Sequence, residues 1–505
     1  MIDTKALREK ILDLAIRGKL VPQDPNDEPA SVLLERIRAQ KQQMVKEGKL
    51  KAKDIKNDTI IFKGEDNLHY EQFQDGSVKC IEDEIPFEVP EGWAWERLGN
   101  ISLIARGGSP RPIKSYLTND ENGINWIKIG DTEKDGKYIY STKEKIKPEG
   151  VLKSRYVKSG DFLLTNSMSF GRPYILKTDG CIHDGWLVIG NIELVFNQDY
   201  LYYALSANFM YKVLAVLAGG STVDNLNSDL VKALLFPIPP MNEQIHIASK
   251  VENLLYLLKK IDENEEIITK DKKNIKSKIL DLAIRGKLVP QDPNDEPASV
   301  LLERIKAEKE ELIKQGKIKR DKKESVIFKG EDNSYYHDLP ENWELVTFSN
   351  IANLISGRDL KPEEYNSDRI GIPYITGASN FNKGAILINR WTTSPKSISI
   401  KNDILLSCKG TVGELAINDH DKIHIARQIM AIRVSTKINL EYIKLFFESM
   451  ILEIKKSADG LIPGISRDDI LSLNIPLPPL AEQCRIVQAI KSSFAQLDEI
   501  TNSIS

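Results

Sequence analysis

Hydrophobic and polar residues alternate along the chain in three patterns, and each pattern occurs twice. The first is the spacing of an amphipathic helix. Leu7, Ile11 and Leu14 lie four and three residues apart, and residues 275–282 repeat this spacing. Such spacing places the apolar side chains on one face of a helix. A glycine follows each stretch, Gly18 in the first copy, at the place where a helix C-terminus takes a left-handed residue.

A second helix is predicted after a proline-rich loop in each copy. The loop PQDPNDEP occupies residues 22–29 and again 290–297. Because an Asp followed closely by a Pro commonly starts a helix, Asp27 and Asp295 are predicted to begin these helices. A tail rich in Lys and Glu follows each helix and is typical of a solvated helix end or a linker. The tails are residues 41–56 and 306–323.

The second pattern consists of short apolar runs with β-branched residues, broken by Gly, Asn, Asp and Pro. It fills residues 86–237 and 339–476 and predicts strands. The strand candidates are residues 124–129, 161–165, 186–196, 372–376, 403–407 and 429–434. Each region then holds one stretch with helical periodicity, residues 200–217 and 440–455. Two α+β domains of about 140 to 150 residues fit this order.

The third pattern is a helical seam that follows a Pro-Pro dipeptide near the end of each half. The first seam has apolar residues at alternating spacings of four and three, namely Ile247, Val251, Leu254, Leu258 and Ile261. The second keeps Ile486, Ile490 and Leu497 but is interrupted at Ser493. A seam of this kind packs against another helix. We expect antiparallel helix pairs, with the C-terminal helix meeting the N-terminal one to close a pseudo-twofold ring.

The chain is a tandem duplication. Residues 10–37 occur again without one change at residues 278–305, an offset of 278 − 10 = 268 residues. Further pairs are IFKGEDN (61–67 and 327–333), PEGW with PENW (90–93 and 340–343) and FPIPPMNEQ with IPLPPLAEQ (236–244 and 475–483). The period is too long for a solenoid, whose repeats span about 20 to 50 residues. It therefore indicates two domain-sized units.

Composition narrows the class of protein. A chain of 505 residues with 41% hydrophobic and 28% charged residues is globular and long enough for three or four domains. Its net charge of -3 means that a phosphate-binding surface must be local. The four cysteines lack CxxC spacing, which argues against a zinc site and a disulfide framework. The chain opens with a helical pattern rather than a leader, and charge interrupts its most apolar stretch, so we expect an intracellular protein.

Catalytic motifs are missing. The sequence has no GxxxxGK[ST], HExxH, GxGxxG or GxSxG. The PIPP and PLPP segments lack the flanking residues of the amino-methyltransferase motif, and we interpret them as helix starts. His420 and His424 have the HxxxH spacing of a metal site, but their surroundings predict a turn and a strand, so we interpret them as surface and edge-strand residues. Asp468 and Asp469 are predicted helix caps rather than nuclease ligands.

The order of these features resembles the specificity subunit of type I restriction-modification systems. The resemblance covers nearly the whole chain and rests on PEGW and PENW, the two PP-x-x-EQ helix starts, two differing inserts and the duplicated helices. It implies that each insert is a target recognition domain that reads one half of a split sequence in double-stranded DNA. It also implies that the helices are a spacer that docks two methyltransferase subunits, through which restriction/translocase subunits join. Methylation and cleavage, with S-adenosylmethionine, ATP and Mg²⁺, would belong to those partners, and this chain would hold no cofactor.

The resemblance further implies DNA-facing loops in each insert. In the first insert they are residues 106–114, 128–137, 166–172, 183–186 and 219–227, and in the second residues 356–361, 376–383, 407–411, 424–428 and 459–466. Gly-containing turns let the backbone approach a phosphate, and Asn, Gln, Ser, Thr, Lys and Arg can contact phosphates or base edges. The predicted DNA-binding residues are Arg106, Ser109, Arg111, Lys114, Lys128, Asn166, Ser167, Ser169, Arg172, Thr222, Arg358, Lys361, Thr376, Ser379, Asn380, Lys409, Thr411, Arg427 and Gln428.

The predicted fold is α+β, with two α/β target recognition domains joined by long antiparallel helices in a pseudo-twofold, circularly closed arrangement. The predicted domains are a helical repeat (1–85), a recognition domain (86–239), central helices (240–338), a second recognition domain (339–478) and a C-terminal helix (479–505). Trp93 and Trp343 are assigned to the core where each recognition domain begins. The predicted function is non-catalytic, sequence-specific DNA recognition. We expect it to take place in the cytoplasm, with no membrane as a partner. Two alternatives stay open, a protein-only tandem-repeat scaffold and a DNA-modifying enzyme; salt-sensitive binding would favour DNA over the scaffold.

Overall fold

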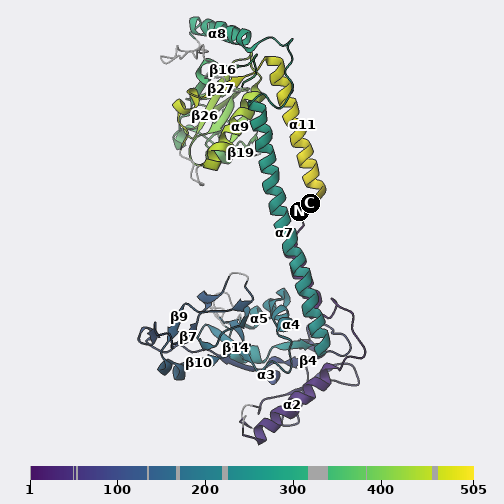
Figure 1. Cartoon of the computed structure of the whole chain (residues 1–505). Coiled ribbons are helices and arrows are strands. Elements are labelled where there is room, and N and C mark those ends of the chain that lie inside the picture. Colours follow the sequence, from purple (N-terminus) through teal and green to yellow (C-terminus); the bar gives the residue numbers. More distant parts are fainter. Residues whose placement is uncertain are drawn as a thin grey trace. The chain divides into compact units, whose positions relative to one another are not determined.

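The computed structural model describes residues 2–48, 51–52, 55–133, 136–166, 171–218, 226–316, 339–382, 384–457 and 464–504 (Figure 1). The chain divides into two compact units, Met1–Asn264 and Glu265–Ser505. The division falls inside α7 (Met241–Ile284), a helix of 44 residues. Each unit holds one helical repeat and one insert, as the duplication predicts.

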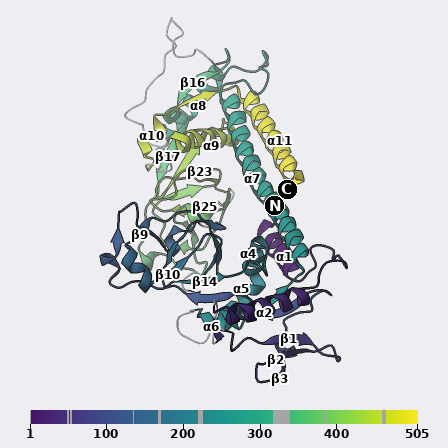
Figure 2. The same ribbon diagram turned by 60° about the horizontal axis from the view of Figure 1, so that its bottom comes forward.

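The helical part of the first unit consists of α1 (Thr4–Ile16), α2 (Ala30–Lys46) and the first part of α7. α1 lies along α7 (Figure 2), and the Thr4 hydroxyl donates a hydrogen bond to Asp262 Oδ1 at 2.8 Å. Gly18 follows α1 with a φ of +66°, and a Cβ there would lie 2.3 Å from the Pro90 side chain. Only glycine fits this left-handed, crowded position. The predicted helix end is therefore confirmed.

The prediction that Asp27 and Asp295 cap the second helices was wrong. α2 and its counterpart α8 (Ala298–Lys314) each begin after a proline, without a side-chain cap. The first N–H of each helix donates instead to a backbone carbonyl of PEGW or PENW, at 2.8 and 3.0 Å. Asp27 accepts a hydrogen bond from Asn242 on α7, and Asp295 pairs with Arg485 on α11 (Leu480–Ile504). Both carboxylates fasten the proline-rich loop to the helix that follows the insert.

The insert of the first unit is built from two five-stranded sheets, with orders β10-β13-β7-β9-β6 and β5-β14-β11-β12-β8. The strands are β5 (Leu103–Arg106), β6 (Leu117–Thr118), β7 (Ile124–Ile127), β8 (Tyr138–Ile139), β9 (Glu144–Ile146), β10 (Arg155–Val157), β11 (Phe162–Thr165), β12 (Pro173–Leu176), β13 (Gly180–Ile182) and β14 (Trp186–Gly190). Along β11, Leu163 packs in a core shared with the other sheet, whereas Phe162 and Leu164 pack in the core that holds α4 (Gln198–Ser206) and α5 (Asn208–Ala218). The second sheet is thus covered on both faces.

Each insert begins and ends on the same short ribbon. β4 (Ala94–Arg97) pairs antiparallel with β15 (Leu235–Ile238), and in the second unit β16 (Glu344–Thr347) pairs in the same way with β27 (Asn474–Leu477). The first ribbon is flanked by α3 (Leu98–Ile101) and α6 (Ser228–Lys232). The first unit also carries a three-stranded sheet of β1 (Ile60–Lys63), β2 (His69–Gln72) and β3 (Val78–Cys80), seen in Figure 2. Because its ends meet on the ribbon, an insert can vary without moving the frame.

The insert of the second unit has the same plan with smaller sheets, of orders β17-β26-β23-β24, β21-β18-β25-β22 and β19-β20. The strands are β17 (Ala352–Ser356), β18 (Ile372–Ile375), β19 (Phe381–Asn382), β20 (Ala385–Ile386), β21 (Trp391–Thr392), β22 (Ile398–Ile400), β23 (Ile404–Ser407), β24 (Leu415–Ile417), β25 (Lys422–Ile425) and β26 (Ile429–Val434). The helices are α9 (Leu440–Ser457) and α10 (Arg467–Leu471). Ser466 and Asp469 form a capping box at α10, so the predicted cap there is confirmed.

In the second unit α11 runs antiparallel to the second part of α7 (Figure 1). Asp498 lies 3.0 Å from Lys272 and 2.9 Å from Lys276, near the far end of α11. Leu280 and Ile490 share one hydrophobic core. The antiparallel pair is therefore confirmed within this unit. The contact between α1 and α11 that would close a ring stays a prediction.

The predicted strands all lie on strands of the structure, but two strands and one helix of the first insert have other bounds. The strand predicted at 124–129 ends at Ile127, where a short 3-10 turn follows. The strand predicted at 186–196 ends at Gly190, because the chain turns at Asn191, whose φ is +55°. The single helix predicted at 200–217 is divided into α4 and α5 at Ala207, which has an extended backbone. The helix predicted at 440–455 is confirmed as α9.

Candidate nucleic-acid interface

The duplicated motifs meet in a buried joint below each insert. Trp93 Nε1 donates to Glu243 Oε2 at 2.8 Å, and Gln23 Nε2 donates to Glu243 Oε1 at 3.1 Å. Burial raises the pKa of Glu243 above its ordinary value, and the two donors stabilise the carboxyl group. The second unit repeats the joint at 2.9 and 2.8 Å with Trp343, Gln291 and Glu482. The assignment of both tryptophans to the core is confirmed.

The glutamine of each PP-x-x-EQ motif supports the insert from below. Gln244 and Gln483 are fully buried. Gln244 Oε1 accepts the backbone N–H of Asn197, and Gln483 Oε1 accepts that of Asn439, at 2.8 and 2.9 Å. These two asparagines stand at the starts of α4 and α9. The shared motifs therefore build the frame, and the variable side chains lie in the loops above it.

The first and fourth predicted loops pack against each other through a glycine in both units. A Cβ on Gly107 would lie 2.2 Å from the carbonyl oxygen of His183, and a Cβ on Gly357 would lie 2.0 Å from that of Ala426. The glycine N–H donates to the carbonyl of Trp186 in the first unit, at 2.9 Å, and to that of Ile429 in the second, at 3.1 Å. The close approach fixes the two loops in one register. Side chains that follow the glycine are therefore held beside the fourth loop.

In the first unit Asp184 joins these loops. Its carboxylate accepts a hydrogen bond from the Ser109 hydroxyl at 2.8 Å and pairs with Arg111 at 3.1 Å, and its carbonyl accepts one from Arg106 Nε at 3.0 Å. Burial would raise the pKa of Asp184, but the Ser109 hydrogen bond and the charges of His183 and Arg111 lower it below its ordinary value. The carboxylate is thus charged and organises three of the predicted DNA-binding residues.

The second unit has the opposite charges at the same junction. Arg427 in the fourth loop pairs with Asp359 in the first loop, at 2.8 Å, and the Arg427 N–H also donates to this carboxylate. His424 is fully buried on β25, where its ring contacts the carbonyls of Ser397 and Arg358 at 2.9 and 3.0 Å. The interpretation of His424 as a surface or edge-strand histidine was wrong, because the side chain is buried and β25 lies between β18 and β22. Its ring anchors the first loop from inside the domain.

A concave site of about 870 Å³ opens beside the first loop of the first unit. Trp126 and Leu117 contribute apolar walls, while Arg111, Lys114 and Lys128 contribute cations. Lys114 is exposed, and Lys128 is half-buried and pairs with Glu144 at 2.7 Å. The site brings together the first, second and fourth predicted loops. Glu144 and Asp184 also line the site, so its three cations exceed its two carboxylates by one, and this excess beside an apolar floor suits contact with a phosphate backbone and bases.

Residues of the third loop divide between the interior and the surface. Asn166 is fully buried, and its Nδ2 donates to the Asp184 carbonyl at 2.9 Å. Arg172, at the other end of the loop, is exposed. The predicted residues Ser167, Ser169 and Thr222 lie outside the described residues.

Gln428 brings three loops of the second unit together. Its Oε1 lies 2.4 Å from the position a Cβ would take on Gly377 and 4.0 Å from that on Gly410, so the exposed amide lies over the second and third loops. Asn380 is 2% exposed, and its side-chain amide forms hydrogen bonds with Thr376, Gly377, Leu387 and Asn389. Exposed members of the predicted set are Arg358, Lys361, Ser379, Lys409 and Thr411, whereas Thr376 is half-buried.

Two acidic residues, Asp184 and Asp359, were missed by sequence reasoning, which sought only donors to DNA. Their signal is present in the sequence. When the first loops are aligned on Gly107 and Gly357, Asp359 takes the position of Ser109; when the fourth loops are aligned on His183 and Ala426, Arg427 takes the position of Asp184.

The fold and the loops define a recognition protein that carries two different binding domains on a duplicated helical frame. Among the described residues no group of three His, Cys, Asp or Glu could hold a metal ion. No helix in the described part of the chain is long and apolar enough to cross a membrane.

A family model described as the type I restriction modification DNA specificity domain matches residues 90–269 and 340–505. The matched ranges span more than half of the chain, which therefore belongs to the family of type I specificity subunits, non-catalytic components that recognise DNA.

The chain is similar to the type I restriction enzyme EcoEI specificity subunit of Escherichia coli, with 28% identity over 99% of this chain and 90% of that one. Two solved structures share the fold at 20% identity. One is the HsdS subunit from Thermoanaerobacter tengcongensis, with a TM-score of 0.53 over 83% of this chain and 93% of that chain. The other, from work on complex assembly and conformational transition of a type I R-M system, has a TM-score of 0.59 over 83% and 94%. The predicted family is confirmed, and neither the scaffold nor the enzyme alternative is favoured.

Proposed function

We propose that the two units read the two halves of one split, asymmetric DNA target. The observation that carries this proposal is the loop junction. It has the same backbone register in both units but pairs Arg111 with Asp184 in the first and Asp359 with Arg427 in the second. One scaffold that presents different side chains suits two different half-sites. Half-sites about one helical turn apart, roughly 34 Å, would lie on one face of the duplex.

The proposed contacts are exposed or half-buried side chains of the loops. Arginine and lysine bind phosphates or guanine, and a glutamine can read adenine, so Arg427 and Gln428 are the proposed base readers of the second unit. Asn166 and Asn380 support the loops from inside, since their amides are buried. The other proposed contacts are Arg106, Ser109, Arg111, Lys114, Lys128, Arg172, Arg358, Lys361, Ser379, Lys409 and Thr411.

Two methyltransferase subunits are the proposed partners, one for each copy of the 28-residue repeat. Exposed residues are identical in the two copies as well as buried ones, and both copies form the same surface ion pair, Arg36 with Glu28 and Arg304 with Glu296. Packing of the hydrophobic core alone does not require the two repeats to have identical exposed residues. Binding of one identical partner by each repeat does require it. Restriction subunits would join through the methyltransferases, and these partner subunits together would carry S-adenosylmethionine, ATP and Mg²⁺, in the cytoplasm.

Single-molecule methylome sequencing tests the proposal. Cells that carry this chain with its neighbouring methyltransferase gene are compared with cells that lack this chain alone, and with the deletion strain after the chain is restored. A split motif that disappears on deletion and returns on restoration is expected. A motif that persists without the chain would contradict the proposal and favour the protein-only scaffold.

A further inference from the structure

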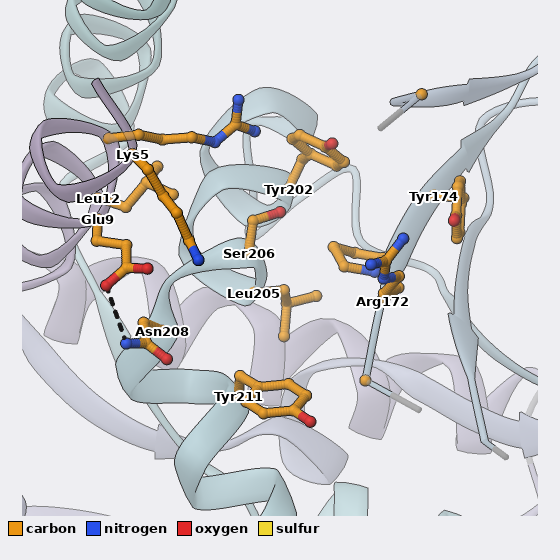
Figure 3. A pocket seen from close by; sticks show the side chains of 14 residues that line it. Lys5, Glu9, Leu12, Arg172, Tyr174, Tyr202, Leu205, Ser206, Asn208 and Tyr211 are labelled. Carbon is orange, nitrogen blue, oxygen red and sulfur yellow. Dashed lines mark hydrogen bonds between the residues drawn. The ribbon is translucent and has the colours of Figure 1, made fainter. Parts of the chain in front are cut away.

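A hollow lined by lysine and arginine lies between the repeat helix and the insert in the first unit. It has a volume of about 480 Å³ and is bounded by α1, the α4–α5 corner and the start of β12. In Figure 3, Lys5 from α1 and Arg172, which immediately precedes β12, enter it from opposite sides. Arg8 also lines it, and Glu9 is the one carboxylate among its described lining residues. The lining charge is therefore 3 − 1 = +2, in a chain whose net charge is -3.

The second unit has a hollow at the equivalent place, with a volume of about 530 Å³. The repeat offset of 268 residues carries Lys5, Arg8 and Leu12 onto Lys273, Lys276 and Leu280, and all six residues line their hollows. The charged lining residues of the second hollow are Lys272, Lys273, Lys276, Lys444, Glu414 and Glu448, which gives 4 − 2 = +2. The duplicated frame therefore forms two hollows with the same lining charge of +2.

The insert walls of the two hollows differ although their backbones correspond. Gly171 and Gly413 have φ values of +76° and +90°, and each donates its N–H to the last residue of the preceding strand, at 2.8 and 2.9 Å. The next residue is Arg172 in the first unit and Glu414 in the second. Lys444 and Glu448 on the helix wall of the second hollow pair with each other at 2.6 Å and their charges cancel, whereas Lys272 on α7 adds a cation. The cations common to both hollows belong to the frame.

Each hollow adjoins the candidate interface. The wall at Arg172 is the end of the third loop, and the start of that loop is fastened to the fourth loop by the hydrogen bond from Asn166 Nδ2 to the Asp184 carbonyl. In the second unit the Cys408 N–H donates to the Gln428 carbonyl at 2.8 Å and makes the same connection. The wall of each hollow is therefore connected through the third loop to the candidate interface.

We propose that each hollow binds the sugar-phosphate backbone beside a half-site, through Lys5 and Arg8 in the first unit and Lys273 and Lys276 in the second. The proposal rests on the proposed function, because backbone contact requires that the loops bind a duplex. Cations on the constant frame suit a contact that ignores base sequence, since the frame stays the same when the inserts differ. The repeat helices would then belong to the DNA interface.

The test uses the complex of the full chain with its methyltransferase subunits. Its affinity for a 40-base-pair duplex that carries the methylated motif is measured by fluorescence anisotropy over a range of salt concentrations. Because each neutralised phosphate contributes about 0.9 to the slope of log K against log salt, Lys5→Gln, Arg8→Gln, Lys273→Gln and Lys276→Gln together are expected to lower the slope by about 3.6. The methylated motif should stay the same.

A matched control removes four exposed lysines that lie outside the 28-residue repeats, the hollows and the loops, with Lys46→Gln, Lys250→Gln, Lys314→Gln and Lys437→Gln, and is expected to keep the wild-type slope. A double variant with Lys5→Gln and Lys273→Gln keeps the ion pair between Lys276 and Asp498. It should lower the slope of log K against log salt by about 1.8. This second variant keeps the test informative if the fourfold variant does not fold.

A wild-type slope in both hollow variants would overturn the proposal and leave the proposed function intact. Failure of the hollow variants to assemble with the methyltransferase would also overturn it, and would assign the hollows to an acidic protein segment. A wild-type complex that neither binds the duplex nor methylates a split motif would refute the proposed function itself, so the two failures are distinguishable.

Discussion

Lengthening α7 between the two units should lengthen the DNA spacer and leave both half-sites unchanged. The proposed insertion is four helix-favouring residues after Asn264, where the units divide. This point lies between Asp262, which bonds to α1, and Lys272, which pairs with α11. Both helix pairs should therefore survive the insertion.

The magnitude follows from helix geometry. An α-helix rises about 1.5 Å per residue, so four residues add about 6 Å along α7. Base pairs are about 3.4 Å apart along each strand, so about 6 Å corresponds most closely to two base pairs. The expected motif has the wild-type half-sites separated by two additional base pairs.

Methylome sequencing of cells that carry the lengthened chain measures the spacer directly. A control chain carries the same four residues after Asp75, in the exposed turn between β2 and β3, and should keep the wild-type motif. A lengthened α7 with an unchanged spacer would refute the reasoning. So would a change in the bases of either half-site.

Three further substitutions test the frame and the loops. Gly107→Ala places a methyl group 2.2 Å from the His183 carbonyl oxygen, so it should displace the first loop and abolish methylation. Gly190→Ala is the control and should be tolerated, because its methyl group would lie 3.4 Å from its nearest neighbour, the Asp161 carboxylate. Equal methylation by the two variants would refute the loop register. Gln428→Ala should cost about 1–3 kcal/mol of discrimination at the second half-site only, measured by anisotropy with duplexes altered in one half-site at a time. Trp93→Phe leaves the buried Glu243 without one donor and should destabilise the protein by about 1–3 kcal/mol in denaturant unfolding. Trp95→Phe is its control, because the buried Trp95 Nε1 has no partner among the described residues; equal losses would contradict a stabilising role for the Trp93 bond.

The frame could be predicted from the sequence because it is encoded by periodicity and repetition. Apolar spacing places α1 and α7, and the repeated motifs mark where each insert begins and ends. The N-cap prediction at Asp27 failed because the first N–H of α2 donates a hydrogen bond to the carbonyl of Gly92. Gly92 is distant in the sequence, so local capping rules could not predict this contact. The three-stranded sheet β1-β2-β3 was missed, since its strands are short and lie in a segment interpreted only as part of a helical region and linker.

The loop residues were harder to predict for a physical reason. An amide that can read a base can equally hydrogen-bond to the protein backbone, and Asn166 and Asn380 do so in the interior, where they donate to the carbonyls of Asp184 and Leu387. Lys5 and Arg8 lie on the polar face of α1, where the helical pattern favours solvent. Only the contact between that face and the insert shows that these cations share a hollow with Arg172.

The central claim is that each insert reads its half-site independently of the other. The most direct test is a chain in which residues 90–239 replace residues 340–478, so that both units carry the first insert between the same frame motifs. Methylome sequencing of cells with this chain should show two copies of the first half-site, inverted relative to each other as the predicted pseudo-twofold frame requires, and no trace of the second. Retention of the original asymmetric motif would contradict the account.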